Sequence, residues 1–199
     1  YHITCFGTLI QDALLNIGGE GEVLIGAITA SIIAFNSTGM PNFVTVLLMC
    51  FAAMLSSGII GIAIAALKVK FNTNETLMTL MINYIMLYDI RYIGETKADW
   101  NFFLREDSER PKFGTFPESA VMAGIPIGQF KLLWSVIIAV VLTVIIYIYL
   151  KYTKQGYEIS VVGDSSATAK YAGMSVGKIV LRTMFISSAM IGLAAALTV

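Results

Sequence analysis

Five long runs of apolar residues limit what this chain can fold into. They cover residues 23–35, 43–67, 77–93, 132–150 and 179–199. A helix crosses the hydrocarbon core of a bilayer with about 20 largely apolar residues, and the first run reaches that length only if it extends back into the IGGEGE sequence. Charged residues make up 13% of the chain, about half their share in a typical soluble domain. We therefore predict an all-α, polytopic bundle of transmembrane helices that forms one domain over residues 1–199.

The same composition argues against several kinds of chemistry. The formal net charge is zero, so nothing indicates binding to nucleic acid. His2 is the only histidine, and the two cysteines, Cys5 and Cys50, lie in apolar surroundings without a C-x-x-C pair. A transition-metal site is therefore not expected, and an intramembrane enzyme would lack its usual nucleophile and base or its metal.

Lysine and arginine near the ends of the runs predict how the chain is oriented. Cytoplasmic loops of membrane proteins carry an excess of these residues. If successive runs alternate in direction, one face of the membrane collects seven basic side chains: Lys68, Lys70, Lys151, Lys154, Lys170, Lys178 and Arg182. We predict that this face is cytoplasmic and includes the segment 151–178, and that the long loop 94–131 lies on the outer face.

Small residues recur at a spacing of four in two of the runs. They form two ladders: Ser57, Gly61 and Ala65, and Ser188, Gly192 and Ala196. Small side chains at this spacing let helices approach each other closely in lipid. We expect this packing to occur inside one subunit, and an interface between two subunits is the alternative.

Glycines and acidic residues interrupt the beginning of the first run, in the sequence LLNIGGEGEVLIGA (14–27). Irregular backbone survives in a membrane only where protein buries it or a water-filled cavity touches it. One interpretation is a broken helix beside a solute pathway, with Asn16 and Glu20 offering polar contacts. The other is an ordinary turn at the membrane surface, in which Glu20 and Glu22 are solvated.

Polar residues also follow one face of the third run. Thr76, Thr79 and Asn83 are spaced by three and four residues, which places them on the same side of a helix. Asn83 lies about 12 Å from the start of that helix, near the middle of a membrane, where a buried amide needs a partner or a cavity. This face either lines the solute pathway, with Thr79, Asn83 and Tyr84 as contacts, or holds helices together through a hydrogen bond of Asn83.

The segment GYEISVVGDSSATAKYAGMSVGK (156–178) separates the last two runs and is too polar to be a span. Asp164 is a suitable N-cap, and Gly173 a natural C-terminal stop, for a helix of about two turns. A helix so short is marginal alone and needs a partner. The sequence GMSVGKI (173–179) is not a phosphate-binding loop, because that motif has four residues between its glycines and Ser or Thr after its lysine. If ATP drives this protein, another chain binds it.

Three stretches resemble one protein family. The stretch GYEISVVGDSSATAKYAGMSVGKIVL is similar to the cytoplasmic GFxxRAVGxNPxAARYAGI segment of permease subunits in ABC importers for simple sugars, nucleosides and branched-chain amino acids. LNIGGEGEVLIGA resembles the FNIGAEGQxLxGA stretch of that family, and FNTNETLMTLMINYI resembles its NEVISTLMLNYI stretch. The last form is most like the nucleoside-type permeases.

The chain departs from the family at several positions. Ser165 and Ser166 replace the usual Asn-Pro, Ser160 replaces the first arginine of RAVG, and Glu22 replaces the glutamine after AEG. The first change leaves Asp164 to cap the short helix, and the second removes a charged contact. Family members are also longer, so we expect this chain to be the middle portion of a permease.

The resemblance implies a division of labour among several chains. The permease pairs with a second copy or a related subunit, above two cytosolic ATPases and beneath a substrate-binding lipoprotein, in the cytoplasmic membrane of a bacterium. It performs no bond chemistry and needs no cofactor, because the ATPase binds ATP. The family places a coupling helix, which sits in a cleft of the ATPase, at residues 164–172. The residues expected in or beside it are Gly163, Asp164, Ala167, Ala169, Lys170, Tyr171, Ala172 and Gly173.

The resemblance favours a nucleoside as the solute, with a simple sugar such as a pentose next. A secondary transporter driven by an ion gradient is a different possibility, and it would need an ionisable relay within the membrane. Glu20 and Glu22 are expected near one end of their run and Asp89 near the end of another, so the sequence shows no such relay. A third possibility is a membrane scaffold that transports nothing. The polar face at Asn83 is only weak evidence against it.

Overall fold

The computed structural model describes residues 18–37, 41–71, 73–96, 103–104, 114, 124–127 and 130–198. Its helices and strands follow in the order α2 (Gly19–Asn36), α3 (Asn42–Phe71), α4 (Glu75–Glu95), β1 (Gly124–Ile127), β2 (Phe130–Leu133), α5 (Trp134–Tyr152), α6 (Lys154–Asp164), α7 (Ser166–Tyr171) and α8 (Val176–Thr198). The two strands pair antiparallel, with Ile127 opposite Phe130, in a hairpin that leads directly into α5.

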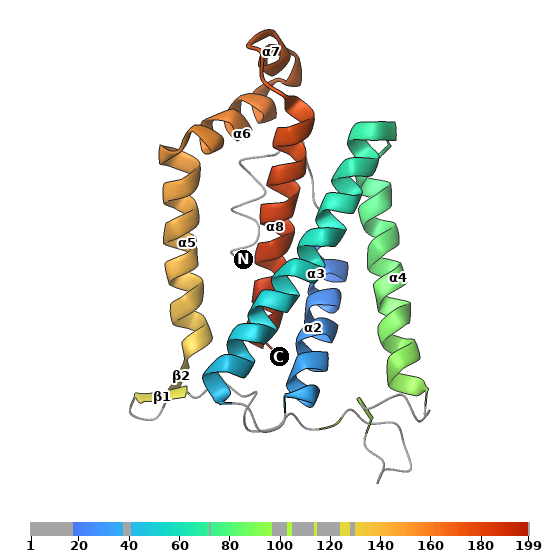
Figure 1. Ribbon diagram of the computed structural model, residues 1–199, viewed down its shortest axis with the longest axis vertical. Coiled ribbons are helices and arrows are strands. Elements are labelled where there is room, and N and C mark those ends of the chain that lie inside the picture. Colours follow the sequence, from blue (N-terminus) through green and yellow to red (C-terminus); the bar gives the residue numbers. More distant parts are fainter. Residues whose placement is uncertain are drawn as a thin grey trace.

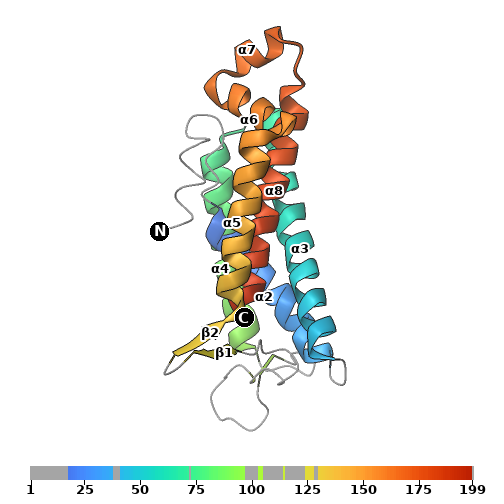
Figure 2. The ribbon, with the colours of Figure 1, turned by 90° about the vertical axis from the view of Figure 1, so that its left-hand side faces the viewer.

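The predicted all-α bundle is confirmed (Figure 1). Helices α2, α3, α4, α5 and α8 run along the long axis of the molecule, and α6 and α7 lie at one end. The β1–β2 hairpin lies at the opposite end, next to the start of α5. Figure 2 shows the same division from the side, with α7 projecting beyond the long helices. The two ends of the bundle therefore carry different structures.

Within the part of the chain that the structure describes, three helices are long and apolar enough to cross a membrane: Asn42–Phe71, Ser135–Tyr152 and Val176–Thr198. Helices α2 and α4 correspond to the other two predicted runs, but they include charged residues such as Glu20 and Asp89 that lower their hydropathy. The 30 residues of α3 span about 45 Å at 1.5 Å per residue. This length exceeds the roughly 30 Å hydrocarbon core of a bilayer, and α3 crosses the bundle at a tilt (Figure 1). The chain is a membrane protein.

The seven basic side chains that the sequence assigned to one face gather at one end of the bundle. Lys68 and Lys70 lie in the last turn of α3, and Lys151 lies in the last turn of α5. These two helix ends lie on the same side as α6, α7 and the start of α8 (Figure 1), which carry Lys154, Lys170, Lys178 and Arg182. We call this side the basic end. The expectation that it faces the cytoplasm stays a prediction.

Helices α3 and α8 pack against each other more extensively than any other pair in the described part of the chain. Small residues make this possible, because a Cβ atom added to Gly61 of α3 would overlap Ser188 of α8. A Cβ atom added to Gly192 of α8 would likewise overlap the Ala53 carbonyl oxygen and crowd Ser57 of α3. The two predicted ladders therefore face each other inside one chain, which confirms the intramolecular packing.

The remaining long helices surround this pair unequally. Helix α2 packs against α3, α8 and α4, and its buried Ala30 and Ala34 form a hydrophobic cluster with Met49, Ala53 and Ala196. Helix α5 stands apart, and no residue of its apolar stretch is buried inside the chain. An apolar surface of that kind is suited to lipid or to other membrane helices.

Candidate functional site

Four helices meet at a group of polar residues that we call the central polar node: Gly21 and Glu22 of α2, Ser57 of α3, Asn83 of α4 and Ser188 of α8. The amide N–H of Gly21 donates to Oδ1 of Asn83, with 2.8 Å between nitrogen and oxygen. The Ser57 hydroxyl donates to the backbone carbonyl oxygen of Glu22 at 2.8 Å. The Ser188 hydroxyl donates to Oε1 of the Glu22 side chain, also at 2.8 Å. The first turn of α2 is thus hydrogen-bonded to three other helices.

The node lies near the middle of the bundle. Ser57 is about halfway along the 30 residues of α3, and Ser188 is about halfway along the 23 residues of α8. Helix α2 therefore begins inside the bundle, and Figure 1 shows its first turn level with the middle of α3. It begins within the glycine-rich stretch, as the interpretation of a broken helix requires. Asn16, the other polar residue of that interpretation, lies outside the described residues. The positive end of the α2 dipole consequently lies at mid-depth.

Glu22, and not Glu20, is the acidic residue that the fold buries. The Glu20 side chain is exposed, whereas the exposed fraction of Glu22 is 0%. Of the two interpretations of this stretch, the surface turn with a solvated Glu22 is therefore excluded, because α2 starts inside the bundle and buries Glu22. Burying a carboxyl group is costly unless it is hydrogen-bonded, and Ser188 and the N-terminus of α2 lower that cost.

The sequence contained a signal for this burial. Glu22 begins a row of residues at a spacing of four that lie on one face of α2 and are otherwise small. The row continues with Gly26, Ala30 and Ala34, and all four residues are buried. A face of small residues indicates close helix contact in a membrane, so the acidic residue at its head belongs in that contact.

The predicted pathway residues of α4 differ in their exposure. Thr79 is fully buried, and its hydroxyl donates to the Thr76 carbonyl oxygen at 3.0 Å. Asn83 makes the hydrogen bond between helices that the sequence offered as one of two interpretations. Tyr84 is 62% exposed. Among the described members of the predicted pathway set, Glu20 and Tyr84 are thus the exposed ones, and contact of any member with a solute stays a prediction.

A second candidate site lies at the basic end, where α6 and α7 connect α5 to α8. Thr153 alone separates α5 from α6 and caps α6: its hydroxyl accepts from the Gly156 amide at 3.1 Å and donates to the Tyr149 carbonyl oxygen at 2.6 Å. Glycine is needed at position 156, because a Cβ atom there would overlap the Leu150 carbonyl oxygen. The chain can therefore change direction sharply between the two helices.

The N-terminus of α7 differs from the prediction. Asp164 is the last residue of α6, so the prediction that it caps the short helix is wrong. Ser165 caps α7 instead, and its hydroxyl oxygen accepts from the Thr168 amide at 3.3 Å. The physical reason is α6, a helix that the sequence analysis missed. It buries Ile159 and Val162, and its last turn continues through Asp164.

The predicted stop of the short helix at Gly173 is confirmed. Gly173 has a φ of +77°, in the left-handed region that favours glycine. The N–H of Met174 donates to the Ala169 carbonyl oxygen at 2.9 Å, and that of Gly173 to the Lys170 carbonyl oxygen at 3.0 Å. These two bonds form a Schellman motif. Helix α7 therefore ends abruptly, and α8 begins at Val176.

Most of the predicted coupling residues are exposed. Ala169 is the exception: it is fully buried and belongs to the same hydrophobic cluster as Ile159 and Val162 of α6. Gly163 is partly buried, and the exposed residues are Asp164, Ala167, Lys170, Tyr171, Ala172 and Gly173. Tyr171 reaches 93% exposure. Helix α7 is thus anchored through Ala169 and presents its other faces outward.

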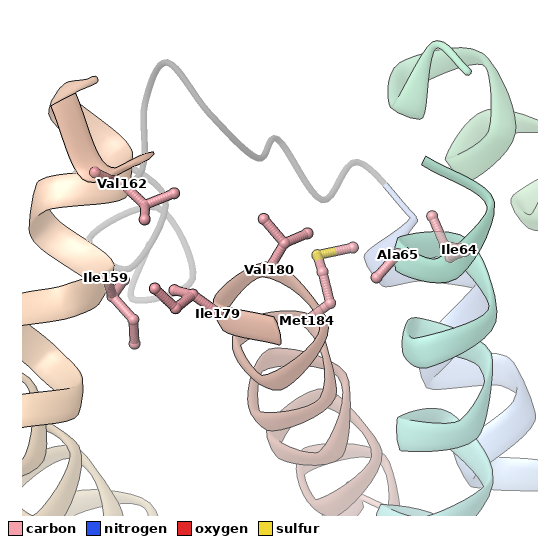
Figure 3. Close-up of a cluster of buried hydrophobic side chains, with 8 residues drawn as sticks. Ile64, Ala65, Ile159, Val162, Ile179, Val180 and Met184 are labelled. Carbon is pink, nitrogen blue, oxygen red and sulfur yellow. The ribbon is translucent and has the colours of Figure 1, made fainter. Parts of the chain in front are cut away.

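The same hydrophobic cluster connects α6 and α7 to the long helices (Figure 3). Its labelled side chains are Ile159 and Val162 of α6, Ile179, Val180 and Met184 of α8, and Ile64 and Ala65 of α3. Figure 3 shows α8 between α6 on one side and α3 on the other. A displacement of α6 would therefore act first on α8, the helix that carries Ser188 of the central polar node.

The family model for the permease component of branched-chain amino acid transport systems matches residues 8–199. The chain belongs to this family. The guanosine ABC transporter permease protein of Bacillus subtilis (strain 168) is 30% identical over 191 residues, which are 94% of this chain and 52% of that relative. The nucleoside ABC transporter permease protein of Lactococcus lactis subsp. cremoris is 24% identical over 94% of this chain and 52% of its own length. The glucose ABC transporter permease protein of Haloferax volcanii is 26% identical over 83% of this chain and 44% of its own length.

These matches confirm the resemblance that the three sequence stretches carried. The chain spans about half the length of the curated relatives it matches. No solved structure matches it. Within the described residues, no group of three or more His, Cys, Asp or Glu side chains could hold a metal ion.

Proposed function

We propose that this permease chain forms part of the membrane pathway of an ATP-driven importer in the cytoplasmic membrane of a bacterium. A separate cytosolic ATPase hydrolyses ATP, a lipoprotein delivers the solute, and a second permease subunit, identical or related, completes the pathway. Membership of the permease family supports this proposal. The observation that carries it is α7, an exposed short helix anchored at the basic end by the buried Ala169.

Helix α7 is suited to receive a push from a soluble partner. Lys170 and Tyr171 are exposed and can be contacted, while the buried Ala169 ties α7 to α6. Helix α6 packs against α8, and α8 carries Ser188 into the central polar node. Movement of α7 would change the packing of α8 against α2 and α3. Two such packings, opening the pathway to opposite sides, are what alternating access requires.

A nucleoside is the solute that we propose. Two relatives are named as guanosine and nucleoside permeases, and a simple sugar is the second candidate because a relative named for glucose also matches. The exposed members of the predicted pathway set fit a nucleoside. The Tyr84 ring can stack on a base, and the Glu20 carboxylate can accept hydrogen bonds from ribose hydroxyls.

A secondary transporter is the competing function, and one observation favours it. Such a transporter uses ionisable residues inside the membrane, and Glu22 is an acidic residue fully buried at mid-depth. Its hydrogen bond with Ser188 and its place in the first turn of α2 give it a structural role that requires no ion gradient. Energy dependence separates the two functions.

The test is uptake of radiolabelled guanosine by proteoliposomes that contain the complete permease with its ATPase and binding lipoprotein. We expect uptake to require ATP on the ATPase side, to stop with vanadate and to persist when ionophores collapse the proton and sodium gradients. Uptake without ATP that collapses with a gradient would contradict the proposal. Stronger competition by unlabelled ribose or glucose than by unlabelled guanosine would identify a sugar permease instead.

A further inference from the structure

An ion pair joins α6 to α8 at the basic end. Nη2 of Arg182 lies 3.1 Å from Oε2 of Glu158, a residue 24 positions earlier in the chain. The side chains are 32% and 21% exposed, respectively, so both are partly buried. Salt screens such a pair less than it screens an exposed one, and the contact is also a charge-assisted hydrogen bond with a defined direction.

Arg182 lies in buried surroundings, so its contact with Glu158 is important for the position of its side chain. Nε of Arg182 is buried and has no hydrogen-bond partner among the described residues. Thr183 and Met184, which follow Arg182 in α8, are buried as well. Loss of the Glu158 carboxylate would leave a partly buried positive charge without the partner that now compensates it, and that is costly.

The pair lies between the two candidate sites. Glu158 directly precedes Ile159, whose side chain belongs to the cluster shared by α6, α7 and α8. Arg182 precedes Ser188 of the central polar node by six residues, about 9 Å along α8. Apolar contacts in the cluster are non-directional and permit α6 to slide along α8. The ion pair has a direction, and it fixes the position of α6 along that helix.

We infer that Glu158 and Arg182 are positioning residues that make α6 and α8 move as one unit when a partner presses on α7. The inference rests on the proposed function for the movement and on the structure for the contact. Neither residue binds solute or ATP in this scheme. Without the pair, α7 would still bind its partner, but sliding between α6 and α8 would absorb part of the displacement.

The test measures ATP hydrolysis and solute uptake together in proteoliposomes that contain the complete transporter. We expect transporters that carry Glu158→Gln or Arg182→Gln to hydrolyse ATP at nearly the wild-type rate and to take up less solute. The number of ATP molecules hydrolysed per solute should rise about threefold or more. The exchanged pair, Glu158→Arg with Arg182→Glu, should bring this ratio back toward the wild-type value. Lys178→Gln is the matched control, because it removes an exposed positive charge one helical turn before Arg182 and should leave the ratio unchanged.

Two results would overturn the inference. One is a wild-type ratio in both single variants. The other is a parallel loss of uptake and hydrolysis that the exchanged pair does not restore, because that pattern indicates damage to the fold alone. If wild-type transporter shows no ATP-dependent uptake, the proposed function fails instead. Amide hydrogen exchange of the purified permease then tests whether the ion pair holds α6. If it does, exchange over Lys154–Asp164 is faster in both single variants than in the exchanged pair.

Discussion

The hydrogen bond between Glu22 and Ser188 should contribute measurably to the stability of the permease. Both side chains are fully buried, and the Ser188 hydroxyl lies 2.8 Å from Oε1 of Glu22. Glu22→Ala removes the acceptor and leaves that hydroxyl buried without it. Leaving a buried polar group unsatisfied costs about 1–3 kcal/mol, and the cavity left by the deleted side chain adds to this cost.

A double-mutant cycle isolates the part that belongs to the pair. We expect a coupling energy of about 1.5 kcal/mol between Glu22→Ala and Ser188→Ala, toward the upper end of what interhelical hydrogen bonds reach in membrane proteins. Glu22→Gln should cost less than about 1 kcal/mol, because its amide oxygen can accept the same bond. The free energy of unfolding is measured by titrating the complete permease in detergent micelles with dodecyl sulfate and following its helix content by circular dichroism.

Ser57 provides the matched control for this cycle. Its hydroxyl donates to the backbone carbonyl oxygen of Glu22, which every side-chain variant retains. The coupling energy between Glu22→Ala and Ser57→Ala should therefore stay below about 0.5 kcal/mol. The reasoning is refuted if the Ser188 cycle gives no more coupling than the Ser57 cycle, or if Glu22→Gln destabilises the permease as much as Glu22→Ala does.

Two further predictions concern the close contact of α3 with α8 and the anchoring of α7. Gly61→Ala should destabilise the permease by about 1–3 kcal/mol, because the added Cβ atom overlaps Ser188. The exposed Ala63→Leu in the same helix should change the unfolding free energy by less than about 0.5 kcal/mol, and equal effects of the two would contradict the packing. Ala172→Arg, at the exposed C-cap of α7, should leave thermal unfolding unchanged and reduce ATP-driven uptake. Ala169→Arg should lower the unfolding temperature, because it places a charge at a fully buried position. Normal uptake by the Ala172 variant would show that the ATPase does not contact the end of α7.

The features that the sequence predicted correctly depend on local chemistry. The apolar runs predicted the long helices because hydropathy and helical period are properties of neighbouring residues. Gly173 predicted the end of α7 because a left-handed residue after a helix favours glycine whatever surrounds it. Helix α6 escaped prediction because the apolar residues between Glu158 and Gly163 are few and are interrupted by Ser160. Only the burial of Ile159 and Val162 against α8 shows that they belong to one helical face. Asp164 was assigned to the wrong helix for the same reason.

The sequence by itself determined that this chain is a helical membrane protein, which end collects its basic residues, and to which family it belongs. It did not determine which acidic residue of the glycine-rich stretch is buried, because Glu20 and Glu22 have similar neighbours along the chain. That depends on the depth at which α2 begins and on which face of α2 meets α8, where Glu22 contacts a serine 166 residues away. Burial and hydrogen bonding at such distances are set by the packing of four helices, and only the tertiary structure brings those residues together.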